Sequence, residues 1–230
     1  MKPPHVLLAL SELPRALADA TLLQPAIPLL RRLPRGAGQA VMVLPGFMGS
    51  DRGNQPLIRF LNSMGYNAMG WGQGQNRGQQ NFSEDGLRER MTRMMQESKG
   101  KITLVGHSLG GLYAREIAKQ QPDVIEQVIT LGSPFAGDPR ATNVSRIRGF
   151  FSKERAIDWA GFERRKKAPP VPTTAIHSRS DGVVNWRCSL EEPSPTAENV
   201  RVRGSHMGLT VNRKVLVVIA DRLARRAAYR

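Results

Sequence analysis

The sequence predicts an α/β fold with a mostly parallel central sheet and helices on both faces. Apolar runs of strand length alternate along the chain with amphipathic stretches of helix length. Strands separated by helices pair in parallel, and the helices then cover both faces of the sheet. The 230 residues, 40% of them hydrophobic, suffice for one continuous core, so we expect residues 1–230 to form a single domain.

Residues 1–38 are expected to begin as a helix and then to be interrupted by prolines. Apolar residues recur there every three or four positions, as on one helix face: Val6, Leu10, Leu13, Leu17 and Ala20. Such a stripe would suit a docking arm. We favour the simpler interpretation, an ordinary helix that covers the sheet.

The next part of the chain alternates strands with helices. Strands are expected at Ala40–Leu44, Tyr66–Met69, Lys101–Val105 and Gln127–Leu131. Helices are expected at Gln55–Met64, Ser83–Lys99 and Leu109–Gln121. Residues 70–81, rich in Gly and Gln, are expected to form a loop.

Residues 138–170 break this alternation, because they combine many Arg and Lys residues with several aromatic ones. We expect them to form a short basic cap inserted in the domain. A cap lining a substrate pocket and a surface excursion with its own small core explain this composition equally well. Beyond the insertion we expect strands at Thr173–His177 and Asn199–Val202 and a closing helix at Leu209–Arg226.

The chain is strongly basic, with 34 Lys and Arg against 19 Asp and Glu and a formal net charge of +15. The basic residues are dispersed, which favours a solvated surface over a dedicated polyanion site. We therefore expect no specific nucleic-acid partner and at most weak association with anionic surfaces. The oligomeric state stays open.

Cys188 is the single cysteine of the sequence, so no intramolecular disulfide can form. The apolar run Val6–Leu10 is too short for a signal-peptide core, and no stretch reaches the length of a membrane span. A cytoplasmic location is the expectation, and secretion by a route without a signal peptide stays open.

The segment Gly106-His107-Ser108-Leu109-Gly110 carries the sharpest chemical signal. It follows an apolar strand and opens a helix, and its glycines flank the serine at the spacing that a tight strand-to-helix turn requires. A serine presented there is a candidate nucleophile, but it needs a base to take its proton. His206 is the best candidate because it follows the last expected strand and precedes the last helix.

Asp181 follows the strand ending near His177 and would orient the imidazole of His206. Asp-Gly is also a common turn sequence, so a purely structural role is the alternative. Glu191, Glu192 and Asp158 are weaker substitutes. We expect the ring of His206 to lie within hydrogen-bond reach of both Asp181 and Ser108.

From Gln39 onward the chain resembles the α/β-hydrolase family, in particular its bacterial lipases and esterases. Besides the serine turn, four stretches carry the resemblance: Val43-Leu44-Pro45-Gly46-Phe47, Leu131-Gly132-Ser133-Pro134, Ser180-Asp181-Gly182-Val183-Val184 and Ser205-His206-Met207-Gly208-Leu209. Ser108, Asp181 and His206 occur in the family's order of nucleophile, acid and histidine.

The resemblance also implies an oxyanion hole formed by the backbone N–H groups of Phe47 and Leu109. Pro45-Gly46 stands where the family often has His-Gly, which puts the usual local hydrogen bonding in doubt. The candidate substrate contacts are Met48, Phe135, Phe150 and Trp159.

The expected activity is hydrolysis of small-molecule or lipid carboxylic esters through an acyl-enzyme on Ser108. No cofactor is expected, and no metal-ligand or nucleotide-binding motif occurs. Two alternatives stay open: thioester cleavage or acyl transfer by the same three residues, and a non-catalytic protein that binds polyanions or anionic membrane.

Overall fold

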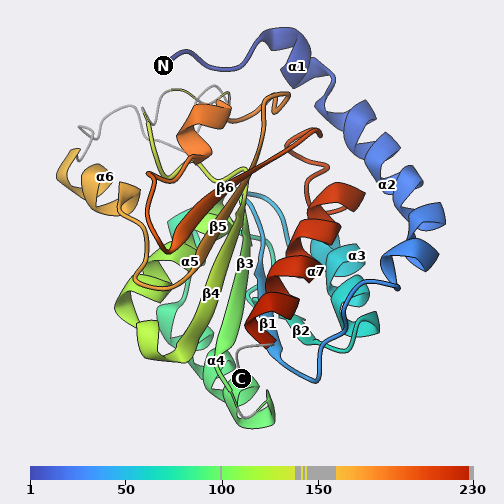
Figure 1. The fold of residues 1–230 in the computed structure, drawn as a ribbon. Helices are drawn as coiled ribbons and strands as arrows, with labels where there is room; N and C mark the ends of the chain where they lie inside the picture. Colours follow the sequence, from blue (N-terminus) through green and yellow to red (C-terminus); the bar gives the residue numbers. More distant parts are fainter. Residues whose placement is uncertain (99, 138–140, 142, 144–158, 228–230) are drawn as a thin grey trace.

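The fold is built around a six-stranded sheet. The structure, a computed structural model, describes residues 1–98, 100–137, 141, 143 and 159–227. All neighbouring strands of the sheet are parallel, in the order β2-β1-β3-β4-β5-β6 (Figure 1). The strands are β1 (Ala40–Leu44), β2 (Asn67–Gly70), β3 (Ile102–His107), β4 (Ile125–Leu131), β5 (Thr173–Ser178) and β6 (Ala197–Val202). The predicted fold class is confirmed.

Helices cover both faces of this sheet (Figure 1). They are α1 (Val6–Leu10), α2 (Glu12–Leu30), α3 (Asp51–Ser63), α4 (Glu84–Ser98), α5 (Leu109–Gln120), α6 (Trp159–Lys166) and α7 (Arg213–Ala227). Strand side chains alternate between the faces: Val41 and Val43 pack with α3 and α7, whereas Met42 and Leu44 pack with α4 and α5. The core therefore consists of two apolar layers, one on each side of the sheet.

The carboxyl ends of the strands lie along one edge of the sheet. Leu44, the last residue of β1, is opposite Gly106 of β3, and His107 is opposite Leu131, the last residue of β4. The last residues of β5 and β6 are likewise paired. Because the strands are parallel and in register, the loops that follow them meet at this edge, where ligands bind in open α/β sheets.

The N-terminal helices differ from the prediction. α2 packs along α7 through buried Leu23 and Leu30, and it does not lie on the sheet. The predicted stripe faces solvent, since Leu10, Leu13 and Leu17 are 73%, 57% and 61% exposed. The interpretation that this apolar face covers the sheet is therefore wrong.

The remaining differences are local. α7 begins at Arg213 and not at Leu209, because Leu209 lies in the core and the Asn212 side chain accepts the N–H of Lys214 at 3.0 Å, as a helix N-cap does. Most of the predicted cap, residues 138–170, lies outside the described residues. Within the described ranges, no helix combines the length and the apolarity needed to cross a membrane.

Candidate active site

Ser108 lies on a sharp turn between a buried strand and a helix. It follows His107, the last residue of β3, and precedes Leu109, the first residue of α5. Its φ of 51° is a left-handed value that few residues except glycine adopt. A Cβ atom on Gly106 or Gly110 would overlap surrounding backbone atoms, which explains both glycines. The turn therefore has the backbone geometry that the motif predicted.

The loop after β1 lies directly beside this turn. A Cβ atom on Gly46 would be 3.2 Å from Cβ of Ser108. Fully buried Asn76 holds the loop, because its side-chain amide donates to the carbonyl oxygen of Pro45 at 2.7 Å. Its backbone carbonyl also accepts the N–H of Met48 at 2.7 Å. Asn76, which no sequence pattern predicted, thus holds the predicted oxyanion loop, and that loop lies beside Ser108.

His206 and Asp181 form a buried pair. Nδ1 of His206 lies 2.6 Å from Oδ2 of Asp181, and both residues are only 4% exposed. The other carboxylate oxygen of Asp181 accepts the N–H groups of Val183 and Val184 at 2.8 and 2.7 Å. Since a carboxylate only accepts hydrogen bonds, Nδ1 carries the proton and Nε2 is the basic nitrogen of the ring.

The Ser108 turn meets this pair through the end of β4. The N–H of Ser108 donates to the carbonyl oxygen of Leu131 at 2.9 Å. The next residue, Gly132, faces the pair: a Cβ atom there would be 3.0 Å from Nδ1 of His206 and 3.1 Å from Oδ2 of Asp181.

The predicted pairing of the three residues is therefore present in part. Asp181 contacts the His206 ring, but no hydrogen bond among the described residues joins that ring to the Ser108 hydroxyl. Catalytic hydrogen bonds often tighten only when substrate is bound, so the contact between Ser108 and His206 stays a prediction.

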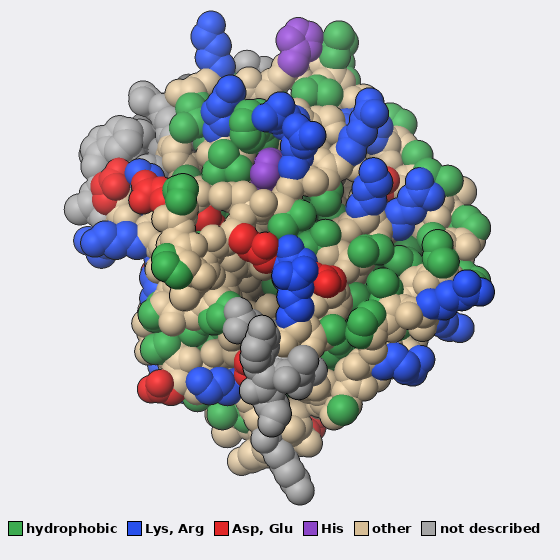
Figure 2. Space-filling view, in the orientation of Figure 1, with side chains coloured by type: hydrophobic (Ala, Val, Ile, Leu, Met, Phe, Trp, Pro, Cys, Tyr) green, Lys and Arg blue, Asp and Glu red, His purple; other side chains and the backbone are tan. Residues whose placement is uncertain are grey.

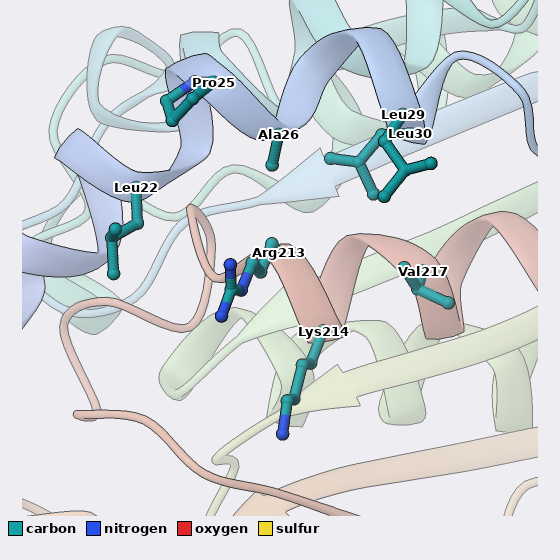
Figure 3. Close-up of a pocket in the computed structure, with 8 residues that line it drawn as sticks. All are labelled: Leu22, Pro25, Ala26, Leu29, Leu30, Arg213, Lys214 and Val217. Atoms are coloured by element: carbon teal, nitrogen blue, oxygen red, sulfur yellow. The ribbon is translucent and has the colours of Figure 1, made fainter.

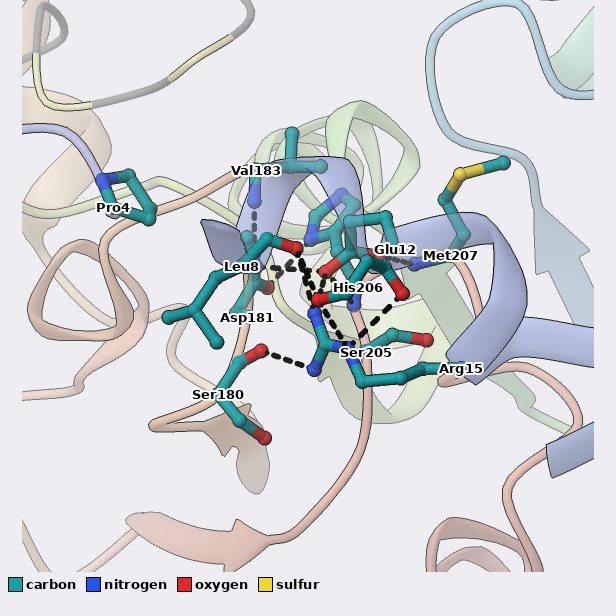
Figure 4. A network of polar contacts seen from close by, with 12 residues as sticks. Pro4, Leu8, Glu12, Arg15, Ser180, Asp181, Val183, Ser205, His206 and Met207 are labelled. Carbon is teal, nitrogen blue, oxygen red and sulfur yellow. Dashed lines mark hydrogen bonds and ion pairs between the residues drawn. The ribbon is translucent and has the colours of Figure 1, made fainter. Parts of the chain in front are cut away.

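A carboxylate from α2 joins the loops that carry this pair (Figure 4). Glu12, the first residue of α2, is 4% exposed. Its Oε1 accepts the N–H groups of Gly182 at 2.7 Å and of His206 at 3.0 Å, and its Oε2 accepts the N–H of Met207 at 2.9 Å. Glu12 thereby connects the loop of the acid to the loop of the histidine.

Arg15, one turn further along α2, balances the buried charge of Glu12. Its guanidinium lies 3.0 Å from Glu12 and donates to the carbonyl oxygens of Ser180 at 2.6 Å and of Leu8 at 2.9 Å (Figure 4). No local sequence pattern pointed to this role, since Ser180 is 165 positions from Arg15 and Gly182 is 170 positions from Glu12.

His107 holds the backbone of His206 from the other side. Its Nε2 lies 3.0 Å from the carbonyl oxygen of His206, which only accepts, so Nε2 of His107 is the donor. Burial, together with the charge of His206, lowers the pKa of His107 to about 3. His107 is therefore a neutral donor in a contact that no sequence pattern predicted.

The pKa of His206 is raised above its ordinary value. Burial would lower this pKa by disfavouring the imidazolium, but the charge and hydrogen bond of Asp181 and the charge of Glu12 outweigh burial. The surroundings thus stabilise a protonated His206, which is what a base requires while it holds a proton in a reaction.

The other candidate acids have different partners. Glu191 forms an ion pair with Arg115 in which both side chains are fully buried. Glu192 is exposed and lies 2.6 Å from Lys166. Asp158 lies outside the described residues. Asp181 is the carboxylate that contacts the His206 ring in the part of the chain that the structure describes.

The residues predicted to contact substrate differ in position and in exposure. Met48 lies on the loop beside Ser108, is 53% exposed and has φ 58°. Phe135 is 1% exposed, and its ring centre lies 3.7 Å from the guanidinium carbon of Arg115. Phe150 lies outside the described residues, as does the side chain of Trp159.

No group of three His, Cys, Asp or Glu side chains in the described ranges could hold a metal ion.

Comparisons with known proteins agree on the fold. The family model described as PGAP1-like alpha/beta domain matches residues 60–165. A putative lipase from Acinetobacter baumannii is 16% identical with a TM-score of 0.61, and the match covers 92% of this chain and 97% of that one. The monoacylglycerol lipase of Paleococcus ferrophilus is 15% identical with a TM-score of 0.57, over 85% of this chain and 99% of that one. The thioesterase domain from the curacin biosynthetic pathway is 17% identical with a TM-score of 0.52, over 84% and 91%.

Proposed function

We propose that the chain is an α/β-hydrolase that cleaves carboxylic esters through an acyl-enzyme on Ser108, and its similarity in fold to lipases supports this proposal. The observation that carries the proposal is the buried pair of Asp181 and His206, 2.6 Å apart, at the edge of the sheet where Ser108 lies on its strained turn. A serine hydroxyl is a weak nucleophile alone, and an imidazole oriented by a carboxylate makes it reactive.

In the first step, Oγ of Ser108 attacks the ester carbonyl carbon while Nε2 of His206 takes the hydroxyl proton. The carbonyl oxygen becomes an oxyanion, which accepts hydrogen bonds from the backbone N–H groups of Phe47 and Leu109. The bond to the alkoxy oxygen then breaks, and the alcohol leaves with the proton from His206. An acyl group remains on Ser108.

In the second step, His206 takes a proton from water and the resulting hydroxide attacks the acyl carbon. The bond to Oγ breaks, the carboxylic acid leaves, and Ser108 recovers its proton from His206. Asp181 stabilises the imidazolium in both steps. The scheme needs no cofactor.

Hydrolysis of p-nitrophenyl esters of increasing chain length tests this proposal. Ser108→Ala should lower kcat/KM by at least about a thousandfold on every ester that the wild type cleaves. Ser194→Ala, the same change in an exposed segment, is the matched control and should match the wild type. Turnover by Ser108→Ala close to the wild-type value would rule out Ser108 as the nucleophile.

Thioester cleavage is the second candidate, because the curacin thioesterase domain has a similar fold. The same residues would act, with a thiol as the leaving group. Matched oxygen esters and acyl-coenzyme A thioesters of one acyl chain separate the two activities. A higher kcat/KM for the oxygen ester supports esterase function, and no turnover of either substrate would favour a binding protein.

A further inference from the structure

The outer side of the N-terminal arm, residues 1–35, is apolar. α1 and α2 expose a series of aliphatic side chains, which is unusual for helices packed on a domain. The exposed fractions are Val6 51%, Leu7 65%, Leu10 73%, Leu13 57%, Leu17 61%, Leu22 50% and Leu29 67%. The inward side carries the polar Glu12 as well as Leu23 and Leu30. Much of the apolar surface of the arm is therefore turned outward.

The exposed charges of this arm are all positive. The exposed charged residues among positions 1–35 are Lys2, Arg31, Arg32 and Arg35. Its two acidic side chains are turned toward the protein: Glu12 binds the loops of the active site, and Asp19 accepts a hydrogen bond from Asn212 at 3.0 Å. Figure 2 shows apolar side chains along the edge formed by α2 with Lys and Arg side chains among them.

A groove between α2 and α7 continues this surface (Figure 3). It has a volume of about 470 Å³ and is lined by apolar residues and two cations: Leu22, Pro25, Ala26, Leu29, Leu30, Val217, Arg213 and Lys214. Aliphatic walls next to positive side chains complement a lipid, which places an acyl chain next to an anionic headgroup.

We propose that the arm docks the protein on the surface of an anionic phospholipid bilayer. α2 has 19 residues and, at about 1.5 Å per residue, lies along about 28 Å of that surface. Its exposed leucines enter the boundary between headgroups and acyl chains while the arginines contact anionic headgroups. Met207 is 51% exposed and is bonded to Glu12, so the loop of His206 lies beside the docked arm.

The positive charges select a bilayer over a second copy of the chain, since two arms face to face would bring like charges together. They also favour anionic over neutral lipid, because each Lys or Arg near an anionic surface adds attraction. The proposal stands on exposure and charge, and it does not depend on ester cleavage.

Flotation with lipid vesicles tests the proposal. The wild type should bind vesicles of phosphatidylcholine containing about 30% phosphatidylglycerol much more tightly than vesicles of phosphatidylcholine alone. Leu10→Gln/Leu13→Gln/Leu17→Gln should weaken binding to the anionic vesicles by at least about tenfold, because apolar area no longer enters the interface. Circular dichroism checks that this variant is folded.

A pair of charge variants locates the electrostatic contact. Arg31→Gln/Arg32→Gln on the arm should weaken binding, whereas Arg88→Gln/Arg93→Gln makes the same charge change on α4, on the other side of the sheet, and should not. Ser108→Ala should bind like the wild type, so that loss of ester hydrolysis and loss of docking are distinguished.

Three results would overturn the proposal. The first is absence of wild-type binding to the anionic vesicles at low salt. The second is full binding by the leucine variant with equal losses in both arginine variants, which would indicate diffuse attraction by the net charge. The third is a wild-type dimer in solution that becomes monomeric in the leucine variant, which would make a second copy of the chain the occupant of this face.

Discussion

At the scale of single residues, His206 is held at three points. Asp181 orients the ring through Nδ1, Glu12 binds the backbone N–H, and His107 binds the backbone carbonyl. A ring held in this way has few orientations available, so little freedom has to be lost when the base acts. The proposed mechanism depends on the first of these contacts most directly.

Replacing Asp181 tests its role as the orienting acid. Asp181→Asn keeps the size of the side chain but removes the charge that stabilises the imidazolium, so kcat should fall by about 10³- to 10⁴-fold. Glu192→Gln, a change in an exposed carboxylate, should leave kcat unchanged. Steady-state kinetics on one p-nitrophenyl ester compares the two, and equal losses would exclude a special role for Asp181.

Glu12 should affect the pH dependence of catalysis. Its charge is one of the causes that raise the pKa of His206, so Glu12→Gln should lower that pKa. Because only neutral His206 acts as the base, the acid limb of the kcat/KM profile should move to lower pH. Asp19→Asn removes the same charge from α2 without contacting His206 and should leave the limb in place. An unmoved limb in Glu12→Gln would contradict the assignment.

Residue-scale prediction from the sequence succeeded where a short motif carried the information. Asp181 was expected to contact His206, and it does. Glu12, His107 and Asn76 were missed because their contacts join positions 194, 99 and 31 residues apart, which no local pattern records. The doubt raised by Pro45-Gly46 has a structural answer, since Asn76 binds the carbonyl oxygen of Pro45.

At the scale of elements, buried strands were the best predicted. β1 has the predicted bounds, Ala40–Leu44, because a parallel strand covered on both faces is a continuous apolar run. The N-terminal helices show the opposite case. Helical spacing indicated which residues share a face, but it does not tell whether that face packs on the protein or faces solvent. Leu13 and Leu17 of α2 face solvent.

The loop after β1 should depend on Asn76. Asn76→Ala removes the hydrogen bond to the Pro45 carbonyl and loosens the loop that carries the proposed oxyanion donor. We expect kcat to fall by about tenfold to a hundredfold, which is less than the loss of a whole oxyanion donor would cause. KM should change little. Asn81→Ala changes the loop after β2 that also carries Asn76, but the Asn81 amide donates to the backbone carbonyl oxygens of Gln73 and Gln75, so this variant should be nearly neutral. A rise in KM alone would assign Asn76 to substrate binding.

At the scale of the whole molecule, the buried ion pair of Arg115 and Glu191 ties separate parts of the fold together. Arg115 also donates to the carbonyl oxygens of Arg165, Lys166 and Lys167 at the end of α6. A fully buried pair stabilises weakly against an apolar replacement, but loss of one partner leaves a buried charge uncompensated.

Arg115→Met should therefore lower the free energy of unfolding by about 3–5 kcal/mol. Lys119→Met is the matched control on α5, because its pair with Glu116 is partly exposed and should contribute less than about 1 kcal/mol. Arg115→Met/Glu191→Leu should recover most of the loss. Urea unfolding measures the free energy of unfolding of all three variants. A loss below about 1 kcal/mol in Arg115→Met would show that the Glu191 carboxylate becomes protonated when its partner is removed.

The most direct test of the central claim is covalent labelling of the nucleophile. A fluorophosphonate reacts with an activated serine: the P–F bond breaks, fluoride leaves, and a bond forms between phosphorus and Oγ. Mass spectrometry of the intact protein should show a single adduct on the wild type, peptide mapping should place it on Ser108, and Ser108→Ala should show none. An adduct of equal yield on Ser108→Ala, or an adduct mapped to another residue of the wild type, would contradict nucleophilic catalysis by Ser108.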